Sequence, residues 1–398
     1  MKKNLFLFCV LLSALILLPE ESNAQLFGGG NKRRKSSRKI GSFSGAKRAF
    51  NPEITYYAIG GGINALNYFG DIAPTPKTLS TDVSFTRPGF NVFLKQKFGD
   101  RYSWRANFMW GRISSSDQEV TTKSNVLFDR NTATRYIRNL DFRNDIYELT
   151  FSAQFDLIRH GGRFASRPPF NVYVFGGAGL FYHNPKGMAP QNFSTDYYAN
   201  GPDANQYPVN NPGEWVSLRD LGTEGQQFSA EVKQRYEDEY GRKIDDPYSR
   251  IQLVLPMGIG ARYKLSNNLD LGIEFSYRHT FTDYLDDVST FYVDLDDFGD
   301  PNDPQAALAM AMSDKSYLYG QLEADGLREY TSLAIIPYTN ESGDFTYSRF
   351  AGYGNPGGRG ALANVRGDGG KQNDVYIVTN ITLTYILGGN FVRGAKFR

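Results

Sequence analysis

Three segments of the chain alternate strictly between apolar and polar side chains, and this pattern limits the fold more than any other feature. They cover residues 102–111, 146–157 and 269–278. A period of two predicts a β-strand with one apolar face and one polar face. Each segment has roughly the 9 to 11 residues that a tilted strand needs to cross a bilayer. An apolar content of only 40% also suits strands that are apolar on one face alone.

Five further segments repeat the pattern more weakly, which brings the predicted number of strands to eight. They lie at 54–67, 90–98, 170–182, 251–263 and 375–387. The connections alternate in length. The short ones are 99–101, 160–169 and 266–268, and the long ones are about 70–87, 114–144, 184–250 and 283–373. Outer-membrane barrels combine short periplasmic turns with long external loops and have an even number of strands. We therefore predict an all-β fold, an eight-stranded antiparallel transmembrane β-barrel with long external loops containing short helices.

The first residues predict export. An opening with two lysines, an apolar run over residues 5–18 and small side chains up to Ala24 are typical of a secretory signal peptide. We expect residues 1–24 to be removed by cleavage after Ala24 and the mature protein to reach the outer membrane. The one cysteine, Cys9, would leave with this peptide, so we expect no disulfide and no Cys-ligated metal.

The ends of the mature chain differ from the predicted barrel, which we place at residues 53–390. Residues 25–52 are rich in Gly, Ser, Lys and Arg without apolar periodicity, and we expect a flexible periplasmic tether there. A solvated tail is the simpler alternative to binding lipid phosphates, cell wall or a partner. We expect residues 391–398 to form a C-terminal tail. The net charge of +2 and the predicted export argue against a nucleic-acid partner.

The polar faces of the predicted strands carry charges of both signs. These residues are Lys95, Lys97, Arg105, Glu148, Arg262, Glu274 and Arg278. The interior of an eight-stranded barrel is only just wide enough for side chains, so we expect these charges to pair and to fill it. This argues against an open porin. A soluble sandwich or lipocalin-like barrel would instead turn its apolar faces inward.

Candidate catalytic groups are few. The chain has three histidines, His160, His183 and His279, and their spacing forces no two of them together. His279 with Ser276 is the one pair that a lipid-modifying barrel enzyme could use. Neither a general base nor an oxyanion donor can be assigned, so we do not expect an enzyme.

The fourth long connection contains an acidic stretch at residues 294–303. Such a stretch could bind Ca²⁺ in an external loop, but it fails the EF-hand pattern, because Phe298 stands where the third oxygen ligand belongs. We expect a solvated acidic loop and no metal or cofactor. Residues 305–312 in the same connection, and residues 229–240 in the third, are predicted to be short helices.

Several blocks of sequence carry a family resemblance. They are residues 253–260, 263–265, 269–274 and 278–289, together with 67–72, 142–149 and 169–175. These blocks resemble the PorG-like outer-membrane barrels of the Bacteroidetes, a family associated with type IX secretion and gliding. The motif residues are Tyr68, Gly70, Asp71, Thr282, Asp283, Tyr284, Leu285, Asp286 and Asp287. These residues form two motifs, the first at residues 68–71 and the second at residues 282–287. The simplest interpretation of the second motif is loop structure, with its aspartates capping a turn.

The resemblance implies a non-enzymatic barrel that anchors periplasmic ring components of the type IX secretion machinery to the outer membrane. Its expected partners are outer-membrane lipid and those ring components. The alternative is a general surface barrel whose long loops bind an extracellular ligand or partner. The resemblance covers about residues 54–387 and leaves out the tether and the two longest loops.

Overall fold

The computed structural model describes residues 55–72, 87–117, 138–159, 164–193, 206–315, 335–339, 346–350, 366–367 and 372–388. All of them belong to the second of the chain's two units, Ala46–Arg398. The predicted signal peptide, the predicted tether, the C-terminal tail and His160 lie outside these ranges, so the expectations for them stay predictions.

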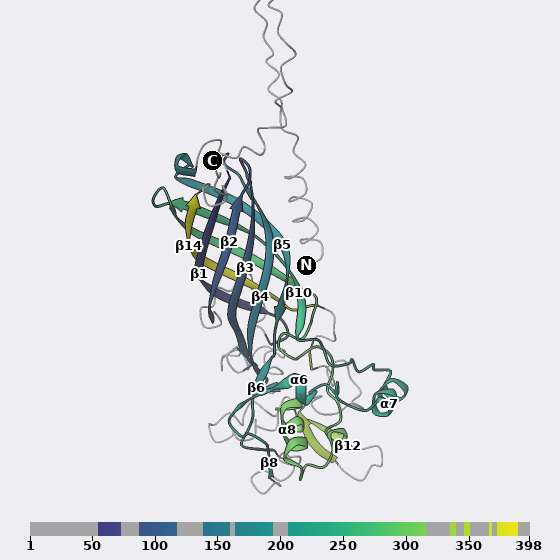
Figure 1. Cartoon of the computed structure of the whole chain (residues 1–398). Coiled ribbons are helices and arrows are strands. Elements are labelled where there is room, and N and C mark those ends of the chain that lie inside the picture. Colours follow the sequence, from purple (N-terminus) through teal and green to yellow (C-terminus); the bar gives the residue numbers. More distant parts are fainter. Residues whose placement is uncertain are drawn as a thin grey trace, which may run out of the picture. The chain divides into compact units, whose positions relative to one another are not determined.

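Eight antiparallel strands close into a barrel (Figure 1). In order around the wall they are β1 (Tyr56–Phe69), β2 (Arg87–Lys97), β3 (Tyr102–Ser116), β4 (Asp141–Asp156), β5 (Phe170–Tyr182), β10 (Ile251–Lys264), β11 (Leu269–Thr280) and β14 (Val375–Gly388). The ring closes where β1 pairs with β14, with Ile63 opposite Ile381. The fold predicted from the alternating segments is confirmed.

The short connections gather at one end of the barrel. They join β2 to β3, β4 to β5 through the short helix η3 (Phe164–Ser166), and β10 to β11. The start of β1 and the end of β14 lie at the same end, because Tyr57 pairs with Gln96 beside the first turn and with Gly388. Short turns and chain ends mark the periplasmic end of an outer-membrane barrel.

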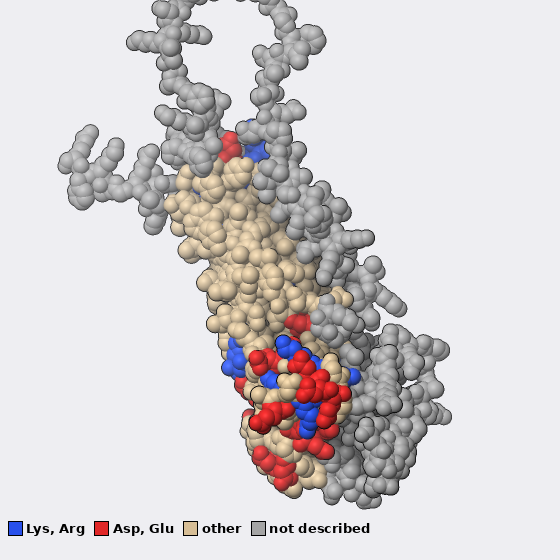
Figure 2. All heavy atoms as spheres, turned by 90° about the vertical axis from the view of Figure 1, so that its right-hand side faces the viewer, with Lys and Arg blue, Asp and Glu red and all other residues tan. Residues whose placement is uncertain are grey.

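The two faces of the wall differ in polarity. Large apolar side chains point outward from every strand and stay exposed. Examples are Ile63, Val92, Phe108, Phe151, Leu180, Ile259, Ile273 and Ile381. Figure 2 shows a broad uncharged band on the wall, with charged side chains gathered mainly beyond one end of it. A wall that is apolar outside and polar inside is what a lipid bilayer requires of a barrel.

Aromatic side chains pair at both edges of this band. At the edge near the long connections, Phe90 packs on Trp110 at 5.5 Å and Tyr147 on Tyr182 at 6.3 Å between ring centroids. At the periplasmic edge, Tyr102 packs on Phe155 at 5.4 Å. Such girdles mark the two bilayer interfaces, so they set the depth of the barrel in the membrane.

The long connections build a layer over the external end. Its elements are β6 (Lys186–Met188), β7 (Asn192–Phe193), β8 (Tyr207–Pro208), β9 (Trp215–Ser217), α6 (Leu218–Leu221), α7 (Ala230–Tyr240), η5 (Leu295–Phe298), α8 (Pro304–Ser313), β12 (Ile335–Thr339) and β13 (Thr346–Phe350). β6 continues the barrel sheet beside β4, and β9 pairs with β6. No helix in the described part of the chain is both long and apolar enough to span a membrane.

Both helices expected from the sequence are present. α7 begins after Ser229, whose side chain accepts the N–H of Val232, and α8 begins after Asp303 with Pro304 in its first turn. Nearly every residue of α8 is buried, in one core with Leu66 and Phe142 at the tops of the strands. A helix that is apolar all round needs such a site, so α8 seals the barrel mouth.

The bilayer placement predicts a depth-dependent effect of charge. Ile381→Arg lies at mid-depth on the lipid face and is expected to lower the free energy of unfolding by about 2–4 kcal/mol, whereas Leu265→Arg in a periplasmic turn should cost about 0–1 kcal/mol. The two side chains are equally exposed, at 49% and 50%. Denaturant unfolding in lipid vesicles measures the difference, and equal losses would contradict the placement.

Candidate functional site

A single carboxylate joins three strands near the periplasmic end of the lumen. Asp156 of β4 accepts the ammonium of Lys97 on β2 at 2.6 Å and the guanidinium of Arg262 on β10. Lys97 and Asp156 are fully buried. A buried carboxylate is stable only when it is paired, so Asp156 fixes these three strands relative to one another.

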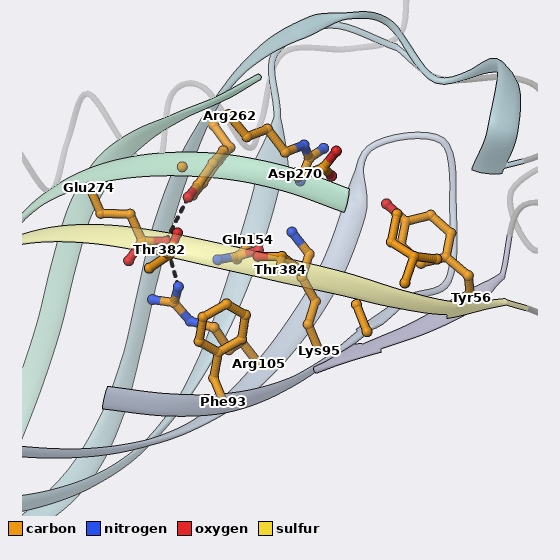
Figure 3. A pocket seen from close by; sticks show the side chains of 14 residues that line it. Tyr56, Phe93, Lys95, Arg105, Gln154, Arg262, Asp270, Glu274, Thr382 and Thr384 are labelled. Atoms are coloured by element: carbon orange, nitrogen blue, oxygen red, sulfur yellow. Dashed lines mark hydrogen bonds and ion pairs between the residues drawn. The ribbon is translucent and has the colours of Figure 1, made fainter. Parts of the chain in front are cut away.

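A second ion pair crosses the lumen between β3 and β11. Arg105 binds Glu274 at 2.5 Å, and the Tyr173 hydroxyl of β5 donates to the same carboxylate at 2.6 Å (Figure 3). The Arg105 guanidinium also lies over the rings of Phe93 and Phe175, at 5.2 and 5.1 Å from their centroids. The pair therefore fills the width of the lumen with charge and aromatic surface.

A third pair lies closer to the external layer. Arg278 of β11 binds Glu148 of β4 at 2.9 Å, and the Tyr376 hydroxyl donates to Glu148 at 2.7 Å. Arg278 also donates to Ser276 at 2.6 Å. Six of the seven charges predicted to form a lumen network are thus in ion pairs.

Lys95 departs from that prediction. Within the described residues its ammonium forms no ion pair, because the nearby carboxylates of Asp156 and Glu274 are already taken by other cations. Instead it lies 5.4 Å from the centroid of the Tyr173 ring and points into a small cavity (Figure 3). This cavity measures about 20 Å³ and a second one near Arg167 about 10 Å³. Each holds roughly one water, so these parts of the lumen are packed.

The predicted network lacked three residues: two carboxylates that form ion pairs, Asp156 and Asp270, and an arginine that connects two turns, Arg167. Asp156 and Asp270 stand on the polar faces of the alternating segments, so the same pattern could have found them. Arg167 lies in a turn without periodicity. It binds Asp270 at 2.6 Å and donates to the Ser266 and Asn267 carbonyls at 2.9 and 2.5 Å. This side chain ties the β4–β5 connection to the β10–β11 turn.

The two family-motif blocks meet in the external layer. The Tyr68 hydroxyl donates to Asp286 at 2.6 Å and lies 3.1 Å from a carboxylate oxygen of Asp374. Asp286 also accepts the N–H of Ile72 at 3.1 Å, and Asp374 accepts the N–H of Leu285 at 2.8 Å. All of these groups are buried. The end of β1, the fourth long connection and the start of β14 are thereby joined at one point.

Asp287 joins the third long connection to the fourth. Its backbone has a φ of +67°, a conformation that Asp tolerates better than most residues. Its carboxylate accepts the Tyr248 hydroxyl at 2.7 Å and the hydroxyl of Thr223. Its carbonyl accepts Arg366 at 2.6 Å, and Arg366 binds Glu224 at 3.3 Å.

Turn capping explains only part of the second motif. Asp286 does accept the N–H of Val288 at 3.0 Å, and Asp283 accepts the Ser289 hydroxyl at 2.7 Å. The remaining bonds of Asp286, and both side-chain bonds of Asp287, reach residues far away in the sequence. The motif therefore works as a connector of loops, which its spacing alone does not reveal.

The other motif residues support this connector. A side chain at Gly70 would collide with the Tyr68 hydroxyl and with Asp374, so the close approach requires glycine. The Asp71 carbonyl accepts Arg138 at 3.0 Å. The Thr282 hydroxyl accepts the N–H of Tyr284 at 3.2 Å. The Tyr284 ring stacks on Tyr248 at 4.7 Å between centroids, and the Leu285 side chain is fully buried.

Burial changes the acidity of these carboxyls. Removal from water raises the pKa of Asp286 to about 6 and that of Asp287 to about 7, although each accepts several hydrogen bonds. Burial, followed by the charges of Asp286 and Asp283, raises the pKa of Asp374 well above its usual range. The cost of removing these carboxylates from water exceeds what their hydrogen bonds and nearby cations return. Protonation of the carboxyls therefore stabilises the folded external layer.

The candidate catalytic pair does not form. Ser276 points into the lumen, where it donates to the Val378 carbonyl at 3.1 Å, whereas His279 has the opposite strand parity and faces outward. His183 is buried beside the Ser249 carbonyl at 3.2 Å, and burial lowers its pKa to about 4. Neither of the two described histidines, His183 and His279, therefore contacts a serine that it could activate.

The acidic stretch at 294–303 is used for local structure. Asp294 and Asp303 cap η5 and α8, and Asp297 binds Arg235 at 2.5 Å and the Tyr236 hydroxyl at 2.8 Å. Over the described ranges, no group of three His, Cys, Asp or Glu side chains is arranged to hold a metal ion.

The fold and its packed lumen define an outer-membrane β-barrel with a sealed external end. A family model described as a domain of unknown function (DUF6089) matches residues 49–201. No curated protein matches the chain.

Several solved structures of outer-membrane proteins are similar to this chain. OprG of Pseudomonas aeruginosa is 10% identical, with 84% of this chain and 97% of that chain covered and a TM-score of 0.31. A major outer membrane protein of Thermus thermophilus is 11% identical, with 83% and 99% covered and a score of 0.30. Neisserial surface protein A is 7% identical, with 83% and 96% covered and a score of 0.28. Likenesses of this degree carry no conclusion, and the fold rests on the strand pairing itself.

The lumen pairs predict a strong asymmetry between single and double substitutions. Glu274→Leu leaves Arg105 charged and buried without its partner, so the free energy of unfolding should fall by about 3–5 kcal/mol. The double variant R105M/E274L removes both charges and should recover most of this loss. Unfolding in lipid vesicles measures both variants. A double variant no more stable than E274L would show that the pair does not carry this energy.

The raised pKa of Asp287 predicts that the external layer loosens as the pH rises. The folded pKa of about 7 exceeds the usual value of about 4, so its stabilisation is complete below about pH 4 and is lost as the pH rises through about 7. Protease cleavage within residues 206–250 should therefore accelerate between pH 5 and pH 8, after normalisation to an unstructured peptide.

Asp287→Asn is the matched test, because Asn tolerates positive φ and the Thr223 and Tyr248 hydroxyls can rotate to bond an amide. The variant should flatten the pH dependence, apart from the part that Asp286 contributes. An unchanged pH profile would remove Asp287 from this role.

Proposed function

We propose that this protein is a PorG-like outer-membrane anchor or accessory component of the type IX secretion machinery and acts by contact with partner proteins. The packed lumen carries the proposal. Ion pairs cross it at several depths, and the two cavities lined by Lys95 and by Arg167 hold about one water each. Cavities of this size leave no room for a larger solute in these parts of the lumen, so we place the function on the surfaces of the barrel.

The periplasmic surface suits an anchor. Arg167 ties two of its turns together through Asp270 and two backbone carbonyls. β1 begins and β14 ends at this end, so the predicted basic tether and the C-terminal tail both continue from it. Turns joined in this way, together with the predicted tether and tail, would offer a multivalent contact to periplasmic ring components.

The external layer supports the alternative, a surface barrel that binds an extracellular partner. Charged side chains of both signs gather over this layer (Figure 2), many of them on and around α7. The raised pKa of Asp286 and Asp287 would make such a surface sensitive to pH. A loop layer that binds a partner must hold its shape, and the carboxylate connectors supply that.

The experiment compares matched charge reversals at the two ends of the barrel. The variant D100K/R101E changes the periplasmic turn between β2 and β3, and E231K/K233E changes the same kinds of charge on the external helix α7. Each tagged variant is crosslinked in native outer membranes, purified in detergent and analysed by mass spectrometry. We expect type IX ring components with the unchanged protein and with E231K/K233E, and their loss with D100K/R101E.

The opposite pattern decides for the alternative. If ring components never co-purify, the anchoring role is wrong. If they co-purify with both charge-reversal variants, the turn between β2 and β3 is not the contact. If E231K/K233E instead abolishes adhesion or capture of an external partner, the external layer is the functional surface.

A further inference from the structure

Two cations face each other across neighbouring strands at the external rim of the wall. Arg143 of β4 pairs with Lys186 of β6, and residues directly opposite in an antiparallel pair project their side chains from the same face. Like charges in this arrangement repel. In the described part of the chain, neither side chain forms an ion pair with a carboxylate. Arg143 also has a buried Nε with no hydrogen-bond partner there. An uncompensated pair of this kind points to a bound anion.

An aromatic ring holds the arginine in place. The Arg143 guanidinium lies 4.4 Å from the centroid of the Trp215 ring on β9, the strand next to β6. Stacking fixes the plane of a guanidinium and leaves the N–H groups along its edge free to bind an oxyanion. Trp215 therefore orients Arg143 to donate hydrogen bonds to an anion, and it leaves the positive charge of Arg143 unneutralised.

Arg143 lines a groove that starts at the bilayer edge, and Lys186 is its cross-strand neighbour. The groove has a volume of about 450 Å³, and its walls include Pro88 and Trp110 at the lipid-facing girdle and Arg112, Ser114 and Arg143 above it. Arg112 is bound by Asp145 at 2.6 Å, and Asp141 at the groove is bound by Lys315. These two carboxylates are therefore already paired. A third cation on the wall, Arg87, donates to the Ser114 hydroxyl at 2.6 Å, whereas Arg143 and its neighbour Lys186 have no carboxylate partner among the described residues.

We propose that this groove binds the phosphate group of a glycolipid in the outer leaflet. Arg143 and Lys186 contact the phosphate, Trp215 orients the guanidinium, and the apolar wall at Trp110 and Pro88 receives the start of the lipid's hydrocarbon. A soluble phosphate would use the cations but not the apolar wall, so an amphiphile fits the groove better. This site does not depend on the proposed secretion role.

Native mass spectrometry of the detergent-purified protein tests the site with lipid A as the probe. Diphosphorylated lipid A should bind, and the dephosphorylated form should bind at least about tenfold more weakly. The double variant R143Q/K186Q should weaken binding of the diphosphorylated form by a similar factor. Lys243→Gln is the control, because Lys243 is an exposed external lysine that neither lines the groove nor is paired with Arg143, and lipid A binding by this variant should be unchanged.

A stability measurement separates binding from folding. Without lipid, Lys186→Gln should be at least as stable as the unchanged protein, because it removes a like-charge contact. With lipid A, it should lose the stabilisation that the unchanged protein gains. Equal binding of both forms of lipid A, or of the double variant, would overturn the proposal. Displacement of lipid A by micromolar inorganic phosphate would assign the groove to a soluble anion instead.

Discussion

The structure depends on carboxylates that are buried in the lumen and shared between strands. Asp156 holds Lys97 and Arg262, and Glu274 holds Arg105 and the Tyr173 hydroxyl. Removing one partner of such a pair costs more than the pair contributes, because an unpaired charge remains away from water. A shift of one residue in any strand would also turn these charges into the lipid. The ion pairs therefore specify the register of the barrel at the same time as they close its interior.

The external layer repeats this arrangement with protonatable groups. Asp286 and Asp287 bind hydroxyl and amide donors from three separate stretches of chain, whereas Arg366 offers the Asp287 carboxylate only a distant charge, at 3.9 Å. Burial dominates, so the pKa of each carboxyl is raised. The lumen is thus held by full charges, whereas the connectors Asp286 and Asp287 of the layer gain from a proton. A rigid wall with a cover that responds to pH is consistent with a protein that acts through its surfaces.

Alternation of side chains was enough to predict every barrel strand, because lipid and lumen impose opposite polarity on successive residues. The same rule identified six paired lumen charges and could have added Asp156 and Asp270. It failed for Lys95, since pairing depends on distances across the lumen and not on the strand itself. The contacts of Arg167 and Asp287 lay beyond prediction for another reason. Their partners are distant in sequence, as with Tyr68 and Asp286, and no local pattern encodes them.

The barrel is a packed body, and a lumen of this kind should not conduct ions. Ion conductance of the purified protein in a planar lipid bilayer tests this most directly, with insertion verified by protease protection of the reconstituted barrel. We predict no stable channel, because the crossing ion pairs and the layer around α8 fill the path. A steady ohmic conductance in the unchanged protein would contradict this and would make the lumen, and not the surfaces, the place to look for function.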